Sequence, residues 1–219
     1  TLRQRIAQNL LKKYRNGALM AALSVGKSEY LTSQNWQDLR QTGTIHLVSI
    51  SGLHLSFTAL WGFFILKTLF GLFAIRKIPP YKLAAALSII IAWSYALIAG
   101  LPLPTERAAI MFTVMMFAHL MGRPIFSFQS LAIALTIILL RTPLSLLSAG
   151  FWLSFTALAL LIVVSRITQT PWRVILLSQL MVSLLLMPLT QSFFGEVSLI
   201  SPLINLIAIP LTTFYILPA

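Results

Sequence analysis

Polar side chains that could do chemistry gather in one short segment, His46-Leu-Val-Ser49-Ile-Ser51-Gly52-Leu-His54, which heads an apolar run that continues to Phe70. Two histidines, two serines and a glycine therefore fall where the chain otherwise predicts a membrane-spanning helix. Polar groups are costly in hydrocarbon, so they tend to face a bundle interior or a wet cavity and to mark function. These residues are the first candidates for a functional site.

The helical period divides these polar residues between two faces. At 100° per residue, Ser51, His54 and Thr58 share one face, and Ser49 lies on roughly the opposite one. A helix that is polar on two sides is expected inside the bundle rather than against lipid. The alternative is structural: serine and threonine bond to carbonyls of their own helix, and the histidines bond to neighbouring helices.

Enzymatic chemistry finds little support among these residues. A Ser51–His54 nucleophile and base would need a third group to orient the base and donors for an oxyanion. Asp38 precedes the span and Glu106 begins another helix. Three histidines, four scattered carboxylates and no cysteine show no metal-ligand spacing, and no Gly-rich phosphate loop is present. We therefore predict no enzyme, metal or other cofactor, and an intramembrane serine hydrolase stays an alternative.

Composition predicts the fold class. The chain is 58% hydrophobic and only 9% charged, whereas a soluble domain carries roughly 25% charged residues. Its mean hydropathy is +0.90, and its apolar residues come in blocks near the ~20 residues that cross a bilayer as a helix. These features indicate an all-α, polytopic transmembrane helical bundle.

The apolar blocks predict the positions of the spans. We expect several short, tilted or broken helices, because about 20 residues are needed for a full span. Prolines in the last block predict a kink or an interruption there. The predicted spans are 45–70, 81–101, 105–121, 125–141, 149–166 and 172–190, with a final apolar segment from about 197.

The N-terminal region differs from the rest. Residues 2–24 place apolar side chains at four-residue spacing and cations on another face, which predicts an amphipathic helix lying in the membrane interface. Thr32 or Ser33 is the expected cap of a short second helix. The domains predicted are therefore 1–44, with interfacial helices, and 45–219, a transmembrane domain. Because the chain starts without methionine and stops inside an apolar block, we expect a fragment of a longer protein.

Loop charges predict the orientation. Cations flank the alternate connections of the spans: Arg76, Lys77, Lys82, Arg123, Arg166 and Arg173. The positive-inside rule places these connections in the cytoplasm, and the N-terminal helix then lies outside. We expect its cations to attract anionic lipid headgroups or an incoming polyanion: Arg5, Lys12, Lys13 and Arg15.

The third span begins with Pro104-Thr105-Glu106-Arg107. Thr105 is a candidate cap, and Glu106 suits the positive end of the helix dipole. Arg107 lies one turn into the span, so its side chain must reach the interface or find a partner. It is therefore a further candidate site residue.

The span over 81–101 carries a stripe of small residues at four-residue spacing, which predicts close helix packing. They are Ala84, Ser88, Ala92, Ala96 and Gly100.

Four stretches of the chain, in order, resemble the competence-protein family of bacterial DNA-uptake channels (ComEC). The segment from Gly43 to His54 is similar to its H-L-x-x-I-S-G-L-H signature, and Pro104 to Met111 resembles its arginine–alanine helix start. Pro143-Leu144 with Gly150-Phe-Trp-Leu-Ser-Phe155, and Gly195 to Pro210 with its S-P-x-x-N element, resemble two later motifs. The resemblance covers about Thr42 to Pro210.

This resemblance implies a plasma-membrane channel that passes single-stranded DNA into the cytoplasm during natural transformation. Its expected partners are single-stranded DNA, membrane lipids, and other competence proteins, namely a DNA receptor and a cytoplasmic motor. The residues predicted to line the DNA path are His46, Ser49, Ser51, Gly52, His54, Thr58, Arg107 and Asn205. A carrier for small anionic or lipid-linked solutes, with broken helices that bind substrate near the midplane, stays an alternative.

Overall fold

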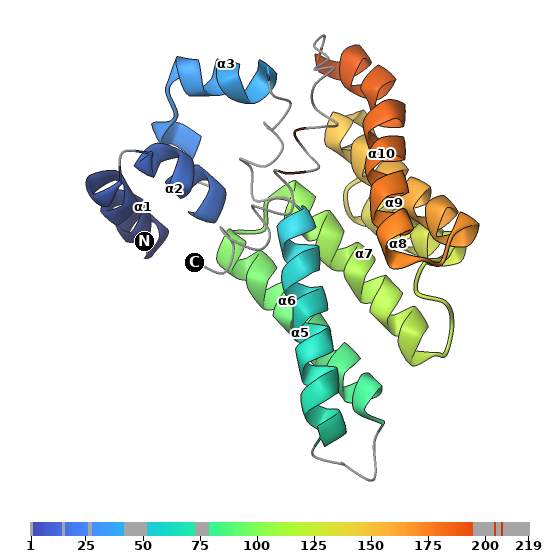
Figure 1. The fold of residues 1–219 in the computed structure, drawn as a ribbon. Helices are drawn as coiled ribbons and strands as arrows, with labels where there is room; N and C mark the ends of the chain where they lie inside the picture. Colours follow the sequence, from blue (N-terminus) through green and yellow to red (C-terminus); the bar gives the residue numbers. More distant parts are fainter. Residues whose placement is uncertain are drawn as a thin grey trace. The chain divides into compact units, whose positions relative to one another are not determined.

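The computed structural model describes residues 2–14, 16–25, 28–41, 52–72, 79–194, 204 and 207. Every regular element within these residues is a helix and none is a strand, which confirms the all-α prediction. The chain divides into two compact units (Figure 1), one of Thr1–Ser51 with Leu176–Ala219 and one of Gly52–Ile175. Each unit is described by itself.

The unit Gly52–Ile175 is a helical bundle in which successive helices alternate in direction (Figure 1). Short connections make neighbours along the chain neighbours in space. Its helices are α5 (Gly52–Leu72), α6 (Pro80–Ala99), α7 (Leu103–Leu120), α8 (Phe128–Arg141) and α9 (Ala149–Ile167), with a 3₁₀ turn, η2 (Pro143–Leu147), between α8 and α9. A further helix, α10 (Pro171–Phe194), begins at the end of this unit.

Small residues bring α6 close to its neighbours. Ala84, Ser88, Ala92 and Ala96 are fully buried, and the three alanines pack with apolar side chains of α5 and α7 in one core cluster. The predicted close-packing stripe is therefore confirmed for these four residues. Gly100 does not extend it, because it is exposed and ends α6 with a left-handed φ of 83°. Glycine adopts that conformation without steric cost.

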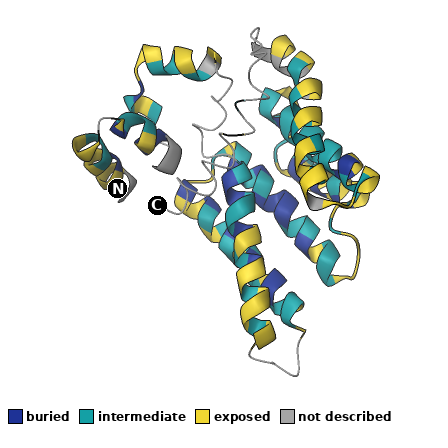
Figure 2. Cartoon of the chain, viewed as in Figure 1, coloured by how far each residue is buried: buried dark blue, intermediate teal, exposed yellow. Residues whose placement is uncertain are grey.

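The exterior of this unit is apolar. Figure 2 shows buried residues along α6 and α7 and many exposed ones on the lower part of α5. Side chains such as Ile98 and Leu140 are 73% and 81% exposed, which suits a helix surface in contact with lipid. Within the described residues, three helices are long and apolar enough to span a membrane: α5, α6 and α9.

Most predicted spans match helices to within a few residues. The spans 81–101, 105–121, 149–166 and 172–190 correspond to α6, α7, α9 and α10, and 125–141 corresponds to α8. Phe128–Arg141 is apolar but shorter than a full span, as expected of a bundle with short helices. Of the first span, 45–51 lies outside the described residues, as does nearly all of the segment from 197.

The N-terminal helix predicted over 2–24 is wrong in one respect, because the structure breaks it into α1 (Leu2–Lys13) and α2 (Gly17–Val25). The two helices pack against each other so closely that a Cβ on Gly17 would lie 2.7 Å from the Leu11 Cα. Glycine permits this approach of two backbones. Only α1 carries the amphipathic pattern, whereas α2 is apolar.

The second short helix is confirmed. A 3₁₀ turn, η1 (Ser28–Tyr30), leads into α3 (Ser33–Gln41). The Thr32 hydroxyl accepts a hydrogen bond from the Asn35 backbone N–H at 3.3 Å, so Thr32 is the cap. Leu31 and Ala22 are buried with Trp36 packed against them, which joins α2 to α3 in a small apolar cluster.

Candidate functional site

The start of α7 sends two charged side chains in different directions. The helix begins at Leu103, two residues earlier than the sequence predicts, because Pro104 in its first turn lacks the N–H that would stay unpaired there. The cap predicted at Thr105 is therefore wrong: Thr105 is buried inside the first turn. Glu106 and Arg107 follow, about 100° apart around the helix.

Glu106 is paired with an arginine on α8. Its Oε1 lies 2.9 Å from Nη2 of Arg141, and the two side chains are 16% and 58% exposed. An ion pair as exposed as this contributes roughly 0–1 kcal/mol. Its main consequence is that Glu106, the only Asp or Glu between residues 52 and 175, does not neutralise Arg107.

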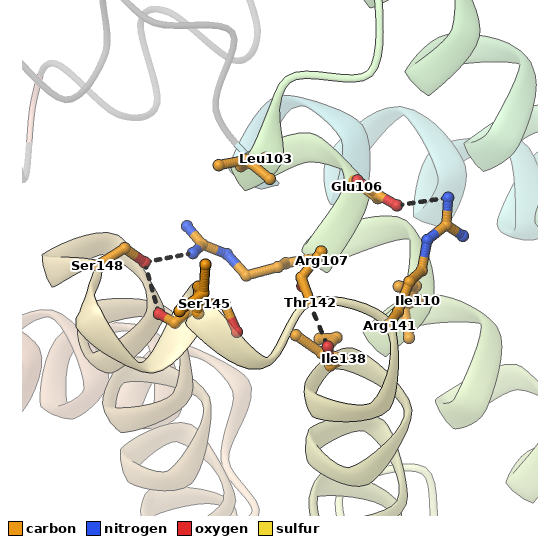
Figure 3. A pocket seen from close by; sticks show the side chains of 10 residues that line it. Leu103, Glu106, Arg107, Ile110, Ile138, Arg141, Thr142, Ser145 and Ser148 are labelled. Carbon is orange, nitrogen blue, oxygen red and sulfur yellow. Dashed lines mark hydrogen bonds and ion pairs between the residues drawn. The ribbon is translucent and has the colours of Figure 1, made fainter.

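Arg107 instead reaches across to the start of α9 (Figure 3). Its Nη1 donates a hydrogen bond to the Ser148 hydroxyl at 3.2 Å. The residue is only 6% exposed, and within the described part of the chain its buried Nε has no hydrogen-bond partner. Nη2 lies against Gly150, where an added Cβ would be 2.8 Å from it. The absence of a side chain on Gly150 makes room for the guanidinium.

The α8–α9 connection holds the partner hydroxyl in place. Ser148 caps α9, because its hydroxyl accepts a hydrogen bond from the Phe151 N–H at 3.3 Å. The same hydroxyl donates to the Ser145 carbonyl at 2.9 Å, so all of its hydrogen-bonding capacity is used. The Trp152 indole N–H donates to the Leu146 carbonyl at 2.9 Å. These contacts anchor η2 to the first turn of α9.

A cavity of about 230 Å³ lies where these elements meet. Charged and hydroxyl-bearing side chains alternate with apolar ones around it (Figure 3), with Ile110 beside Arg141 and Ile138 beside Thr142. The Ser145 hydroxyl at its wall is buried and, among the described residues, has no hydrogen-bond partner. The lining residues are Leu103, Glu106, Arg107, Ile110, Ile138, Arg141, Thr142, Leu144, Ser145 and Ser148.

The arrangement of the helices places this cavity at one end of the bundle. The end of α6, the start of α7, the end of α8 and the start of α9 all lie there (Figure 1). The other end carries the cations that the sequence analysis assigned to the cytoplasm: Lys82, Arg123, Arg166 and Arg173. With that orientation the cavity faces the outer side of the membrane.

The other predicted site residues on α5 lie away from the cavity lining. His54 is 2% exposed, and its backbone carbonyl accepts the Thr58 hydroxyl at 2.9 Å. Thr58 therefore makes the helix-internal bond that was the structural alternative. Gly52 sits where α5 meets α7, since a Cβ there would be 2.8 Å from the Ala108 Cβ. A role for these three residues in lining a path stays a prediction.

Several predicted residues cannot be placed. His46, Ser49, Ser51, Asn205 and Arg15 lie outside the described residues. Of the N-terminal cations, Arg5, Lys12 and Lys13 are exposed on α1, and Lys13 Nζ lies 5.6 Å from the centre of the Tyr14 ring. Their attraction for lipid or polyanion also stays a prediction.

Sequence reasoning identified Arg107 but missed Ser145, Ser148 and Gly150 as its surroundings. A serine directly before an apolar helical run is a cap signal, and it marks Ser148 as the start of α9. Nothing local in the sequence links that cap to an arginine 41 residues earlier. As for metals, the described residues bring together no group of three or more His, Cys, Asp or Glu side chains.

Comparison with known proteins identifies the family. The family model described as "Competence protein" matches residues 23–219. The chain belongs to the competence protein family. Together with the three described helices that are long and apolar enough to span a membrane, this membership makes it a membrane protein.

Three relatives cover nearly the whole chain. It is 33% identical to competence protein ComA of Neisseria gonorrhoeae over 99% of this chain and 32% of that protein. It is 30% identical to recombination protein 2 of Haemophilus influenzae, over 91% of this chain and 27% of the relative. It is 29% identical to ComE operon protein 3 of Bacillus subtilis, over 91% of this chain and 25% of that relative. This competence-family chain thus spans about a quarter to a third of the length of these relatives. No solved structure matches it significantly.

Proposed function

We propose that this chain forms the part of a DNA-uptake channel through which a single strand crosses the bacterial inner membrane during natural transformation. The matching family model and one of the relatives are named for competence, the state in which a cell takes up DNA. A strand with one phosphate per nucleotide cannot cross hydrocarbon unaided, so it needs a route lined by fixed donors or positive charge.

The observation that carries the proposal is the burial of Arg107 beside the cavity, where no carboxylate of the described residues pairs with it. A buried cation is costly unless it is paired. The carboxylate closest to it in sequence, Glu106, is bound to Arg141. An anion that arrives from outside the protein supplies the missing charge, and in a competence-family protein that anion is DNA.

The proposal assigns the remaining features as follows. The domain of residues 45–219 is the conduit, and the helices of residues 1–44 lie on the outer membrane surface. There the exposed cations of α1 attract DNA phosphates or anionic headgroups. The conduit is not an enzyme, and the driving force comes from other proteins of the competence machinery.

A transformation assay tests this function. Cells that express the full-length protein with Arg107→Gln should yield about 30-fold fewer transformants or worse, because truncating a buried charge contact costs roughly 2–5 kcal/mol. Lys67→Gln is the matched control: Lys67 is an exposed cation on α5 that does not line the cavity. Both variants are compared at equal amounts in the membrane. Wild-type transformation by Arg107→Gln contradicts the proposal.

Crosslinking tests the path itself. A photoactivatable single strand is supplied to transforming cells, and the adducts are mapped by mass spectrometry. Adducts on η2 and the first turns of α7 and α9 support a conduit. Adducts confined to residues 2–24 indicate a receptor surface instead and overturn the channel assignment.

A further inference from the structure

We propose that the cavity between α7, η2 and α9 binds one deoxynucleotide unit of the strand, with its phosphodiester on Arg107 and its sugar on the apolar wall. This inference rests on the proposed function and deepens it. It names the chemical unit that the site recognises, and it separates the residues that bind this unit from those that position them.

Two residues of the cavity lining carry donors that are left unused. The Nε of Arg107 and the hydroxyl of Ser145 are both buried, and neither has a hydrogen-bond partner within the described residues. Both residues line the cavity. A buried donor without a partner costs about 1–3 kcal/mol, so a ligand with acceptor oxygens stabilises this arrangement.

The guanidinium is oriented for a phosphate. Nη1 is engaged by Ser148, which leaves the edge formed by Nε and Nη2. That edge offers two parallel N–H groups, the geometry that arginine uses to hold two phosphate oxygens at once. The first turn of α9 adds the positive end of a helix dipole next to this edge. Ser148 is therefore a positioning residue, because its own hydrogen bonds are already used.

Gly150 has the same kind of role. Its missing side chain is what allows Nη2 to lie where it does, since an added Cβ would be 2.8 Å away. Substitution by alanine keeps every charge and hydroxyl of the site but displaces the guanidinium. The alanine variant therefore tests whether binding depends on where the guanidinium lies, because its charge is still present.

The size and lining of the cavity limit the ligand. A volume of about 230 Å³ is below the roughly 300–1,000 Å³ of pockets that hold drug-sized ligands, so the cavity suits the sugar and phosphate of one nucleotide rather than a longer stretch. The wall made by Leu103, Ile110, Ile138 and Leu144 favours an organic substituent over free phosphate. Among the described residues the lining carries one positive charge more than its ion pair accounts for, which matches the single negative charge of a phosphodiester.

A phospholipid headgroup is also a phosphodiester, and the experiment distinguishes the two sources. The full-length protein is placed in nanodiscs of phosphatidylcholine, and binding of fluorescent oligo(dT) is measured by anisotropy over a range of salt concentrations. Each phosphate contact on a single strand contributes about 0.7 to the slope of log K against log salt. Arg107→Gln should therefore weaken binding about tenfold and reduce the slope by about 0.7.

Two glycine variants and a neutral strand give the controls. Gly150→Ala should weaken binding, though less than Arg107→Gln, because the added Cβ displaces the tip of the arginine without removing its charge. Gly71→Ala should not weaken binding, because nothing lies within 4 Å of an added Cβ at Gly71. With a methylphosphonate oligonucleotide, whose backbone is neutral, Arg107→Gln and the wild type should bind equally. Unequal binding to the neutral strand overturns the phosphate assignment.

The outcomes separate this inference from the proposed function. If transformation requires Arg107 but oligonucleotide binding is the same in Arg107→Gln, the nucleotide site is wrong and the channel proposal stands. If binding depends on Arg107 but transformation does not, the channel proposal fails and the site stands. If Arg107→Gln loses only co-purified phosphatidylglycerol, measured by mass spectrometry, the site holds a lipid headgroup and the inference is overturned.

Discussion

Three glycines on α5 differ in what a new side chain would meet: a fixed Cβ, the tip of a flexible side chain, or nothing. Substitution of each by alanine should therefore change the free energy of unfolding by a different amount. A Cβ at Gly52 would lie 2.8 Å from the Ala108 Cβ and 3.3 Å from the Pro104 carbonyl oxygen. A Cβ at Gly62 would lie 2.7 Å from the Ile91 Cδ1, the tip of a flexible side chain. At Gly71 nothing lies within 4 Å.

The expected magnitudes follow from these contacts. Two carbon atoms need roughly 3.5–4.0 Å, and both Cβ atoms at the Gly52 contact are fixed to their backbones, so α5 and α7 must separate by about 1 Å. Overpacking of this kind costs about 1–3 kcal/mol. Rotation of Ile91 away from Gly62→Ala costs about 0.5–1.5 kcal/mol, which the gain in helix propensity largely offsets. Gly71→Ala keeps that gain, up to about 1 kcal/mol.

Unfolding of the full-length protein in mixed micelles, driven by added SDS and followed by tryptophan fluorescence, measures the three free energies. The predicted order of stability is Gly71→Ala, then Gly62→Ala, then Gly52→Ala. Equal stability of the Gly52 and Gly71 variants would refute the close contact of α5 with α7 and with it the packing of the bundle at this end.

Three further predictions concern the same bundle. The Trp93 indole N–H donates to the Thr113 hydroxyl at 3.0 Å, so a double-mutant cycle of Trp93→Phe and Thr113→Val should give a coupling of about 0.6 and at most ~1.7 kcal/mol; zero coupling contradicts the bond. Ala92 is fully buried, so Ala92→Leu should lower the free energy of unfolding in SDS by about 1–3 kcal/mol. Ile90→Leu is the control: the site is 59% exposed, and the free energy should change by less than about 0.5 kcal/mol. Ser127→Ala removes the cap of α8, a hydrogen bond of 3.1 Å from the Ser130 N–H. It should lower the free energy of unfolding by about 0.5–2 kcal/mol and leave oligonucleotide binding unchanged. Weaker binding would show that the loss of a cap is enough to explain a binding defect.

Sequence patterns predicted correctly those features that depend only on residues close to one another along the chain. A stretch of apolar residues near bilayer length is enough to predict a membrane helix, since no other spanning structure satisfies its backbone. The cap at Thr32 depends only on residues within one turn. The buried stripe from Ala84 to Ala96 follows from a spacing of four residues.

The same reasoning failed where a contact between helices decided the outcome. A continuous pattern predicts one helix over residues 2–24, but the structure has two, α1 and α2, and the backbone of α2 at Gly17 packs on α1. The start of α7 is a separate, local case: Thr105 resembles a cap, but Pro104 suits the first turn of a helix, so α7 begins at Leu103.

The amino-acid sequence by itself determined that this protein is a bundle of membrane helices of the competence family and that Arg107 needs a partner. Only the tertiary structure decided which partners the two neighbouring charges take: Glu106 pairs with Arg141 on α8, and Arg107 binds the cap of α9. Helix periodicity sets the direction in which each side chain leaves α7. The atoms that it meets belong to other helices, and their positions depend on how the whole bundle packs.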